Sequence, residues 1–256
     1  MYCQTHLYFA ERVLGQQNDR ITLGCILPDM VIGGNFNHFE AHCLGLEIYG
    51  LRPANVAHLD LIRAVATHGF KPKGLDYYGD EQYLDFERGY CFEKARALTE
   101  RTVDACNIPP EMGWWKAHNI VEMGVETIIS ARDNYYDRLR AALSNRQLVQ
   151  EVDALLGQIS GAGSVDLVLR AERFYGFIEK ERATAESLAN KYSRQMQMRH
   201  NVNIDATKVA LLINDAAELV AADIMEFFEA TAKLVTENIG GMKDLKPGDT
   251  NLADHR

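Results

Sequence analysis

The sequence predicts an all-α protein, a multi-helix bundle. Apolar residues recur at helical spacing through most of the 256-residue chain, and no segment shows the strict alternation that is typical of a half-buried strand. Gly and Pro cluster between the periodic segments, where they mark turns and loops. We expect long crossover loops in the first half of the chain and long helices in the second.

The first half of the chain alternates helices with Gly- and Pro-containing loops. Gly15 is the expected C-cap of the first helix, and Pro28-Asp29 ends a short apolar segment. The expected elements are a helix over 5–15, the apolar segment over 21–27, a loop over 31–36, a helix over 54–68 and a loop over 70–80.

From about residue 81 onward the chain is predicted to be almost continuously helical. Helices are expected over 81–105, 111–131 (with a continuation to 143 left open), 146–159, 165–197 and 205–238. Pro109-Pro110 separates the first two of these. We therefore predict a metal-site helical domain over 1–143, a C-terminal helical segment over 144–239 packed on it, and a disordered polar tail over 240–256.

Composition excludes several classes of function. A hydrophobic fraction of 47% and a charged fraction of 25% are ordinary for a globular protein. The net charge of −9 argues against a nucleic-acid-binding protein, and no stretch has the roughly 20 apolar residues of a transmembrane helix. The start of the chain lacks the features of a secretory signal, and the five cysteines form no Cys-x-x-Cys pair, so we expect reduced thiols in a cytoplasmic protein.

The most informative segment is a predicted helix that carries three ionisable side chains on one face. His118, Glu122 and Glu126 follow one another at intervals of four residues, so they form a row along the helix. Their neighbours are mostly apolar, which predicts that the row is buried. A buried carboxylate without a partner is costly, so we expect a cation beside this row.

Further candidate metal ligands lie in the first half of the chain. They are His6 on the first helix, Asp29 after Pro28, and His38 or His42, which are themselves four residues apart. Imidazole and carboxylate ligands together suit zinc, with iron or manganese as alternatives when more oxygen ligands join. We interpret His58 and His68 as surface or structural residues, and Cys43 as a core thiol rather than a ligand.

The order of these motifs resembles the zinc-dependent phospholipase C family. The resemblance rests on Thr5-His6, on Leu23-Gly24-Cys25-Ile26-Leu27-Pro28-Asp29, on His38 or His42, and on His118-x-x-x-Glu122, and it covers only the N-terminal half. It implies an all-helical enzyme that binds zinc ions at the centre of its bundle and hydrolyses phosphodiester bonds.

One part of the family pattern differs. The family has Gly-Tyr-x-x-His-x-x-x-Asp on a middle helix, whereas here Gly89-Tyr90 is followed by Glu93 and Ala97. One histidine ligand is then replaced by a carboxylate and one aspartate is lost, and we expect one or two metal ions instead of three.

The leading hypothesis from the sequence is a metal-dependent hydrolase acting on a small phosphoester. Asp29 is the expected general base or bridging ligand, while Glu126 and Glu93 are expected beside the metal, with Glu126 orienting His118 or a bridging water. The alternatives are a non-catalytic helical protein with a structural metal site, which self-associates through its C-terminal helices, and a regulatory metal or small-ligand sensor.

Overall fold

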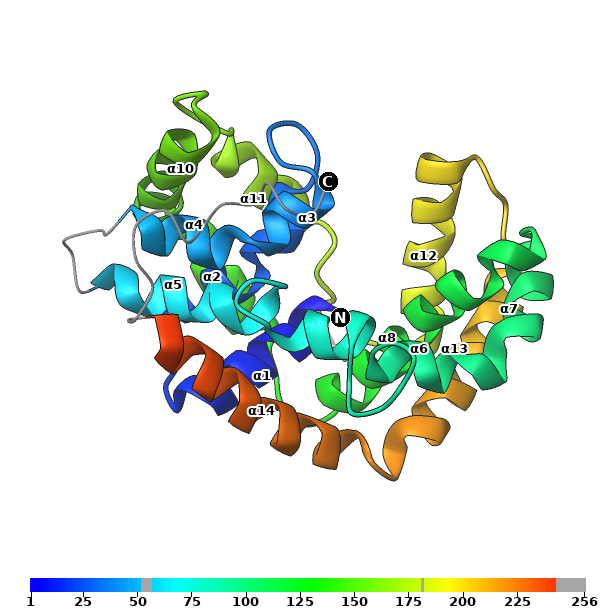
Figure 1. The fold of residues 1–256 in the computed structure, drawn as a ribbon. Helices are drawn as coiled ribbons and strands as arrows, with labels where there is room; N and C mark the ends of the chain where they lie inside the picture. The colour runs from blue at the N-terminus through cyan, green and yellow to red at the C-terminus, as the bar shows by residue number, and fades with distance from the viewer. Residues whose placement is uncertain (52–56, 181, 243–256) are drawn as a thin grey trace. The chain divides into compact units, whose positions relative to one another are not determined.

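The computed structural model describes residues 1–51, 57–180 and 182–242, and these residues form an all-α fold (Figure 1). Fourteen α-helices, α1 to α14, account for most of the described chain, and no strand is formed within it. The nearest approach to a β-structure is a pair of isolated bridges from Phe36 to Ile32 and Gly33. The predicted fold class is therefore confirmed. The tail expected over 240–256 lies almost entirely outside the described residues.

The chain divides into two compact units, each built from three separate stretches. Unit 1 comprises Met1–Thr5, Tyr77–Tyr136 and Glu179–Ala230, and unit 2 comprises His6–Asp76, Asp137–Ile178 and Thr231–Arg256. The domain boundary expected near residue 143 stays a prediction, because compactness does not test whether residues 1–143 fold on their own.

Unit 2 is organised around the packing of α2 on α5. Helix α4 also packs on α5, and α11 packs on both α2 and α10 (blue, cyan and green in Figure 1). The helices of this unit are α2 (Asp19–Val31), α3 (His38–His42), α4 (Leu44–Gly50), α5 (Ala57–His68), α10 (Arg146–Ser160) and α11 (Leu167–Tyr175), together with most of α1 (Cys3–Leu14) and α9 (Tyr136–Ser144).

Unit 1 is organised around the long buried helix α8 (Gly113–Ser130), which corresponds to the helix predicted over 111–131. Helices α6, α7 and α13 pack against α8, and α12 packs against α13. These helices are α6 (Tyr90–Ala95), α7 (Thr99–Cys106), α12 (Ala185–His200) and α13 (Ala206–Ala221), and α14 (Ile224–Gly241) begins in this unit.

Helix α2 is longer than the predicted apolar segment. It runs through Pro28 and ends after Val31, whereas the sequence predicted an end at Pro28-Asp29. Proline removes one backbone donor, and Pro28 lies only three residues before the last residue of the helix, Val31. Asn18 starts the helix by accepting a hydrogen bond from the backbone of Ile21 at 3.0 Å. Asp29 therefore lies in the last helical turn and not in a loop.

Three segments predicted as continuous helix are interrupted. Residues 82–89 are not helical, and α6 begins only after Gly89. The segment over 165–197 is divided between α11 and α12, because Thr184 and Ser187 form a capping box that starts α12. The segment over 205–238 is divided at Asp223, whose carboxylate accepts a hydrogen bond of 2.6 Å from the hydroxyl of Tyr90.

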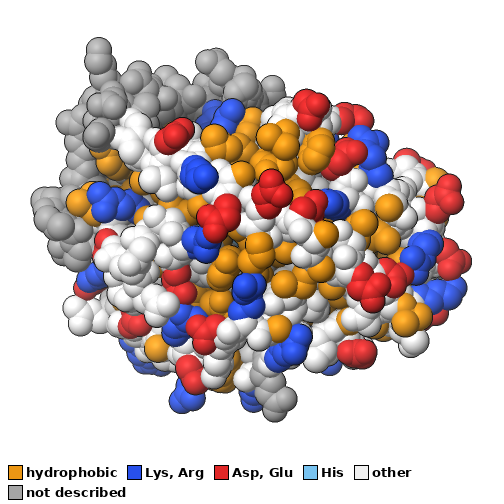
Figure 2. Space-filling view, turned by 90° about the horizontal axis from the view of Figure 1, so that it is seen from below, with side chains coloured by type: hydrophobic (Ala, Val, Ile, Leu, Met, Phe, Trp, Pro, Cys, Tyr) orange, Lys and Arg blue, Asp and Glu red, His pale blue; other side chains and the backbone are white. Residues whose placement is uncertain are grey.

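Charges of both signs are mixed on the surface. On the face seen in Figure 2, acidic and basic side chains alternate among hydrophobic ones, and neither sign forms a continuous field. In the part of the chain that the structure describes, every helix is too short or too polar to cross a membrane.

Candidate metal centre

Four histidine and aspartate side chains converge in the interior of unit 2. His6 lies on α1, His42 ends α3, His68 ends α5, and Asp76 lies eight residues further along the chain. All four are at most 4% exposed. Buried ionisable groups of this kind are stable only when they are paired with each other or with a metal ion.

Asp76 is at the centre of this cluster. Its Oδ1 atom lies 3.3 Å from Nε2 of His6, and its Oδ2 atom lies 3.2 Å from Nε2 of His42 and 3.1 Å from Nε2 of His68. The rings of His6 and His68 are stacked, with centroids 3.6 Å apart and an angle of 9° between the planes. One carboxylate therefore faces three imidazole nitrogens.

The hydrogen bonds behind the rings determine which nitrogens are available. Nδ1 of His42 lies 2.8 Å from the carbonyl oxygen of His38, and Nδ1 of His68 lies 2.7 Å from the carbonyl oxygen of Cys25. A carbonyl only accepts hydrogen bonds, so each Nδ1 carries a proton and each Nε2 of a neutral ring presents a lone pair. The two Nε2 atoms are 3.3 Å apart. Two lone pairs at this distance repel unless a proton or a metal ion lies between them.

The electrostatics of the cluster keep its carboxylate ionised. Burial raises the pKa of Asp76, but the positive charge around this carboxylate and the hydrogen bond with His42 outweigh it, so the pKa of Asp76 lies well below its usual range. Burial and the neighbouring His68 lower the pKa of His6. Burial also lowers the pKa of His68, but Asp76 outweighs it and the net pKa is raised. Divalent metals take an ionised carboxylate beside neutral imidazoles, so a metal bound here would displace the proton of His68.

Asp29 connects this cluster to the surface. Its Oδ1 atom lies 3.9 Å from Nε2 of His68, and its side chain is 31% exposed. Asp29, His42 and His68 form one group whose ligand atoms lie within 4.8 Å of one another, and His6, His68 and Asp76 form another. The cluster is thus buried on the Asp76 side and open to solvent on the Asp29 side.

Two glycines allow the helices to approach closely enough to form the cluster. A Cβ atom on Gly24 would lie 2.7 Å from the carbonyl oxygen of Leu61, so only glycine permits this crossing of α2 and α5. A Cβ atom on Gly69 would collide with the carbonyl oxygen of His42, to which the backbone N–H of Phe70 donates at 2.7 Å. These contacts place the end of α5 beside α3.

A second group of possible ligands lies in unit 1. Ligand atoms of Asp80, His118 and Glu122 lie within 4.8 Å of one another, and the amino group of Met1 donates a hydrogen bond of 2.9 Å to Glu122. Burial, followed by the charge of that amino group, lowers the pKa of His118 to about 3. The imidazole of His118, which stacks on Phe92 at 4.1 Å between centroids, is therefore neutral at pH 7.

Glu126 is satisfied without a cation. Its carboxylate accepts hydrogen bonds from the backbone N–H groups of Gln4 and Thr5 at 3.1 and 2.9 Å, and from the hydroxyl of Thr5 at 2.7 Å. These N–H groups lie in the first turn of α1, where backbone donors have no partner within the helix. Burial raises the pKa of Glu126, and these hydrogen bonds oppose it. These hydrogen bonds satisfy the carboxylate of Glu126 without a cation, and its predicted role of orienting His118 or a bridging water stays a prediction.

The structure distinguishes His42 from His38. His42 is buried and faces Asp76, whereas His38 is exposed as a residue and only its ring is covered, by stacking on His42 with centroids 4.2 Å apart. Burial, followed by the charge of His42, lowers the pKa of His38 to about 4. His38 belongs to none of the three groups of possible ligands found among the described residues, and Glu93, which pairs with Arg96 at 2.8 Å, also lies outside them.

Sequence reasoning missed His68 and Asp76 in unit 2 and Asp80 in unit 1. His68 is the last residue of its helix and is followed by glycine, and Asp76 lies in a segment predicted to be a loop. His118 and Glu122 belong to unit 1, whereas His6, Asp29 and His42 belong to unit 2, so a single site shared by all five stays a prediction.

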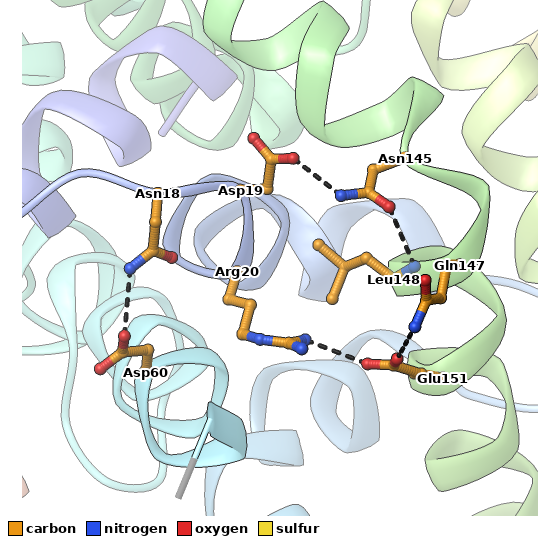
Figure 3. Close-up of a pocket in the computed structure, with 8 residues that line it drawn as sticks. All are labelled: Asn18, Asp19, Arg20, Asp60, Asn145, Gln147, Leu148 and Glu151. Atoms are coloured by element: carbon orange, nitrogen blue, oxygen red, sulfur yellow. Dashed lines mark hydrogen bonds and ion pairs between the residues drawn. The ribbon is translucent and has the colours of Figure 1, made fainter.

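A separate pocket of about 570 Å³ lies elsewhere in unit 2 (Figure 3). Its lining residues are Asn18, Asp19, Arg20, Asp60, Asn145, Gln147, Leu148 and Glu151. Figure 3 shows these side chains paired across the pocket, with Arg20 directed at Glu151 and Asn18 at Asp60. A ligand would have to displace these pairs.

Comparison of the chain with family models, curated proteins and solved structures finds no match. The site is therefore interpreted from its own geometry and from the resemblance in the order of its motifs.

Proposed function

We propose that the protein is a metal-dependent hydrolase that acts on a phosphoester and uses the cluster in unit 2. The observation that carries the proposal is the pair of Nε2 atoms of His42 and His68, 3.3 Å apart and both facing the carboxylate of Asp76. Both rings are held by backbone carbonyls in the tautomer that binds metals through Nε2. Phosphoester hydrolysis is inferred from the resemblance to the zinc-dependent phospholipase C family.

Zinc is the proposed metal, as one or two ions. Three imidazoles and one or two carboxylates match its usual nitrogen and oxygen ligands, whereas iron or manganese would favour additional oxygen ligands. The two oxygens of Asp76 face different histidines, His6 on one side and His42 with His68 on the other. This arrangement suits a carboxylate that binds one ion or bridges two.

The half-exposed Asp29 gives the site its catalytic geometry. A bound divalent ion would lower the pKa of a water molecule from about 15.7 to about 7 and offset charge on a phosphate oxygen. Asp29 lies at the solvent-facing edge, 3.9 Å from His68, where its carboxylate can accept a proton from an attacking water. The buried Asp76, by contrast, is surrounded by imidazoles, and its proposed role is to bind the metal.

The alternative is a structural or sensory metal site without catalysis. It is favoured by one observation: His6, His42, His68 and Asp76 alone offer four buried ligands, which is the closed coordination of a structural zinc site. Substitution of the partly exposed Asp29 distinguishes a catalytic metal site from a structural one. In a catalytic site, Asp29→Asn removes activity although the protein still takes up the metal when zinc is in excess, whereas in a structural site there is no activity to lose.

Metal analysis and an activity panel test the proposal. The purified protein is expected to contain about one zinc per site by elemental analysis and to hydrolyse a member of a panel of phosphomonoesters and phosphodiesters. His68→Gln is expected to lose the metal of unit 2, and His118→Gln reports separately on unit 1. His58→Gln is the control, because His58 belongs to none of the ligand groups. Unchanged metal content in His68→Gln would refute the site in unit 2.

We also propose that the protein works in the cytoplasm and associates with itself. All five cysteines are free thiols, as in a reducing compartment. In unit 1, Met198 and Leu211 expose 80% and 58% of their surface on α12 and α13, and these side chains are candidates for a contact between copies. Size-exclusion chromatography with light scattering measures this association, and a mass that does not change with concentration and equals one chain would exclude it.

A further inference from the structure

Arg170 on α11 bonds to the backbone at the C-terminal end of α2. Its Nη2 atom donates to the carbonyl oxygen of Gly33 at 2.8 Å, and its Nη1 atom lies 3.4 Å from the carbonyl oxygen of Ile32 and 3.5 Å from that of Met30. Its Nε atom donates to the carbonyl oxygen of Val165 at 3.0 Å, within its own segment. The guanidinium therefore joins α11 to the end of α2.

The chemistry of a helix end explains these contacts. The last four carbonyls of a helix have no partner within the helix, and a cation is favourable at that end because of the helix dipole. A guanidinium suits this position because its planar fork presents several N–H groups at once. Arg170 supplies the charge and the donors together.

The segment that Arg170 holds lies between two candidate ligands. Asp29 is in the last turn of α2, which ends at Val31. Helix α3, which carries His42, begins seven residues later at His38, with Asn37 as its N-cap. Gly34 has a φ of +72°, and a Cβ atom there would lie 2.5 Å from Nη2 of Arg170. The guanidinium thus packs directly on the backbone of the connecting loop.

We infer that Arg170 is a positioning residue for the metal site, acting mainly through Asp29. This inference rests on the proposed metal-binding function. Asp76 is held among three imidazoles, but Asp29 is 31% exposed and 3.9 Å from His68, so its position depends on the backbone of the last turn of α2. Arg170 holds the backbone directly after that turn, most closely at the carbonyl oxygen of Gly33.

Two variants of Arg170 and one matched control test the inference. Arg170→Met removes the charge and the fork, and Arg170→Lys keeps the charge alone. Arg20→Met is the control. Arg20 lies at the N-terminal end of α2, away from the candidate ligands, and pairs with Glu151 at 3.1 Å. Zinc affinity is measured in the folded proteins by competition with a chromophoric chelator, and Tm is measured with zinc and with chelator.

Arg170→Met is expected to weaken zinc binding about tenfold, as the loss of an outer-shell partner does, and to reduce the rise in Tm that zinc produces. The zinc affinity of Arg170→Lys is expected to lie between those of Arg170→Met and the wild type, because one ammonium group cannot reach all the carbonyl oxygens. Arg20→Met is expected to lower Tm equally with and without zinc. In an Asp29→Asn background, Arg170→Met is expected to cause no further loss of affinity.

Wild-type zinc affinity in Arg170→Met, with Tm lowered equally in both conditions, would show that Arg170 is only structural. A tenfold loss that persists in the Asp29→Asn background would show that it acts through other ligands. Failure of the proposed function is distinguishable from both, because the wild-type protein would then bind no zinc at its unit 2 ligands.

Discussion

His68 and Asp76 form a buried ion pair, with Nε2 of His68 3.1 Å from Oδ2 of Asp76 and both side chains at most 5% exposed. The pair stabilises the interior of unit 2 without any metal. Asp76 raises the pKa of His68 above its usual value, although burial alone would lower it. A proton then occupies the place proposed for the metal.

Asp76→Asn is expected to abolish zinc binding in unit 2 and to destabilise the metal-free protein. Removal of one partner of a buried ion pair leaves the other uncompensated, which costs about 3–5 kcal/mol. Chemical denaturation in the presence of a chelator measures the free energy of unfolding. His58→Gln is the control, and equal stability of Asp76→Asn and the wild type would contradict the pairing.

Glu126→Gln is expected to destabilise unit 1 by about 1–3 kcal/mol, the cost of unsatisfied buried hydrogen-bonding groups. The amide NH₂ would replace one of the two carboxylate oxygens and would face the backbone N–H of Gln4 or that of Thr5, which now donate to different oxygens. Glu93→Gln, which removes only a partly exposed pair with Arg96, is expected to change stability by less than about 1 kcal/mol. Urea unfolding of both variants makes the comparison, and equal effects would show that Glu126 does not cap α1.

The sequence was sufficient to predict the fold class and most helices, because periodicity is a local property. It was not sufficient for the breaks within long apolar stretches. The division between α11 and α12 depends on a capping box at Thr184 and Ser187, a short signal within a periodic segment. The division at Asp223 depends on its hydrogen bond with Tyr90, which joins residues 133 positions apart.

The candidate ligands show the same limit. His6, Asp29 and His42 could be selected because they lie near recognisable motifs, and the structure brings them together with His68. Asp76 could not be selected, because nothing in its local sequence distinguishes it from any other loop aspartate. Its role comes from the close approach of α3 and α5 that Gly69 permits, which is a tertiary relationship.

His118 predicts a dependence of stability on pH. Its pKa in the folded protein is about 3, chiefly because of burial and next because of the Met1 amino group, against about 6.5 when unfolded. Its contribution to stability is complete above pH 6.5 and is lost as the pH falls toward 3, because only the unfolded state takes up the proton. The slope in this range is about 1.4 kcal/mol per pH unit for one such group.

Two measurements check this dependence, both with chelator present. The ring-proton NMR signal of His118 is expected to stay at its neutral shift from pH 8 to pH 5, and His118→Gln is expected to have a shallower loss of stability below pH 6.5. A His118 signal that titrates near pH 6.5 would contradict the burial of its ring.

The buried thiols predict slow chemical modification of the native protein. Burial raises the pKa of Cys43 and that of Cys106 to about 12, so at pH 8 almost none of either thiol is ionised, and the thiolate is the reactive form. Cys25 and Cys91 are buried as well, whereas Cys3 is partly exposed. With DTNB, a colorimetric thiol reagent, we expect one thiol at most to react quickly in the native protein and all five in denaturant. Cys3→Ser is expected to remove the fast phase of the reaction. Fast reaction of Cys43 would show that α3 and α4 open readily around the proposed metal site.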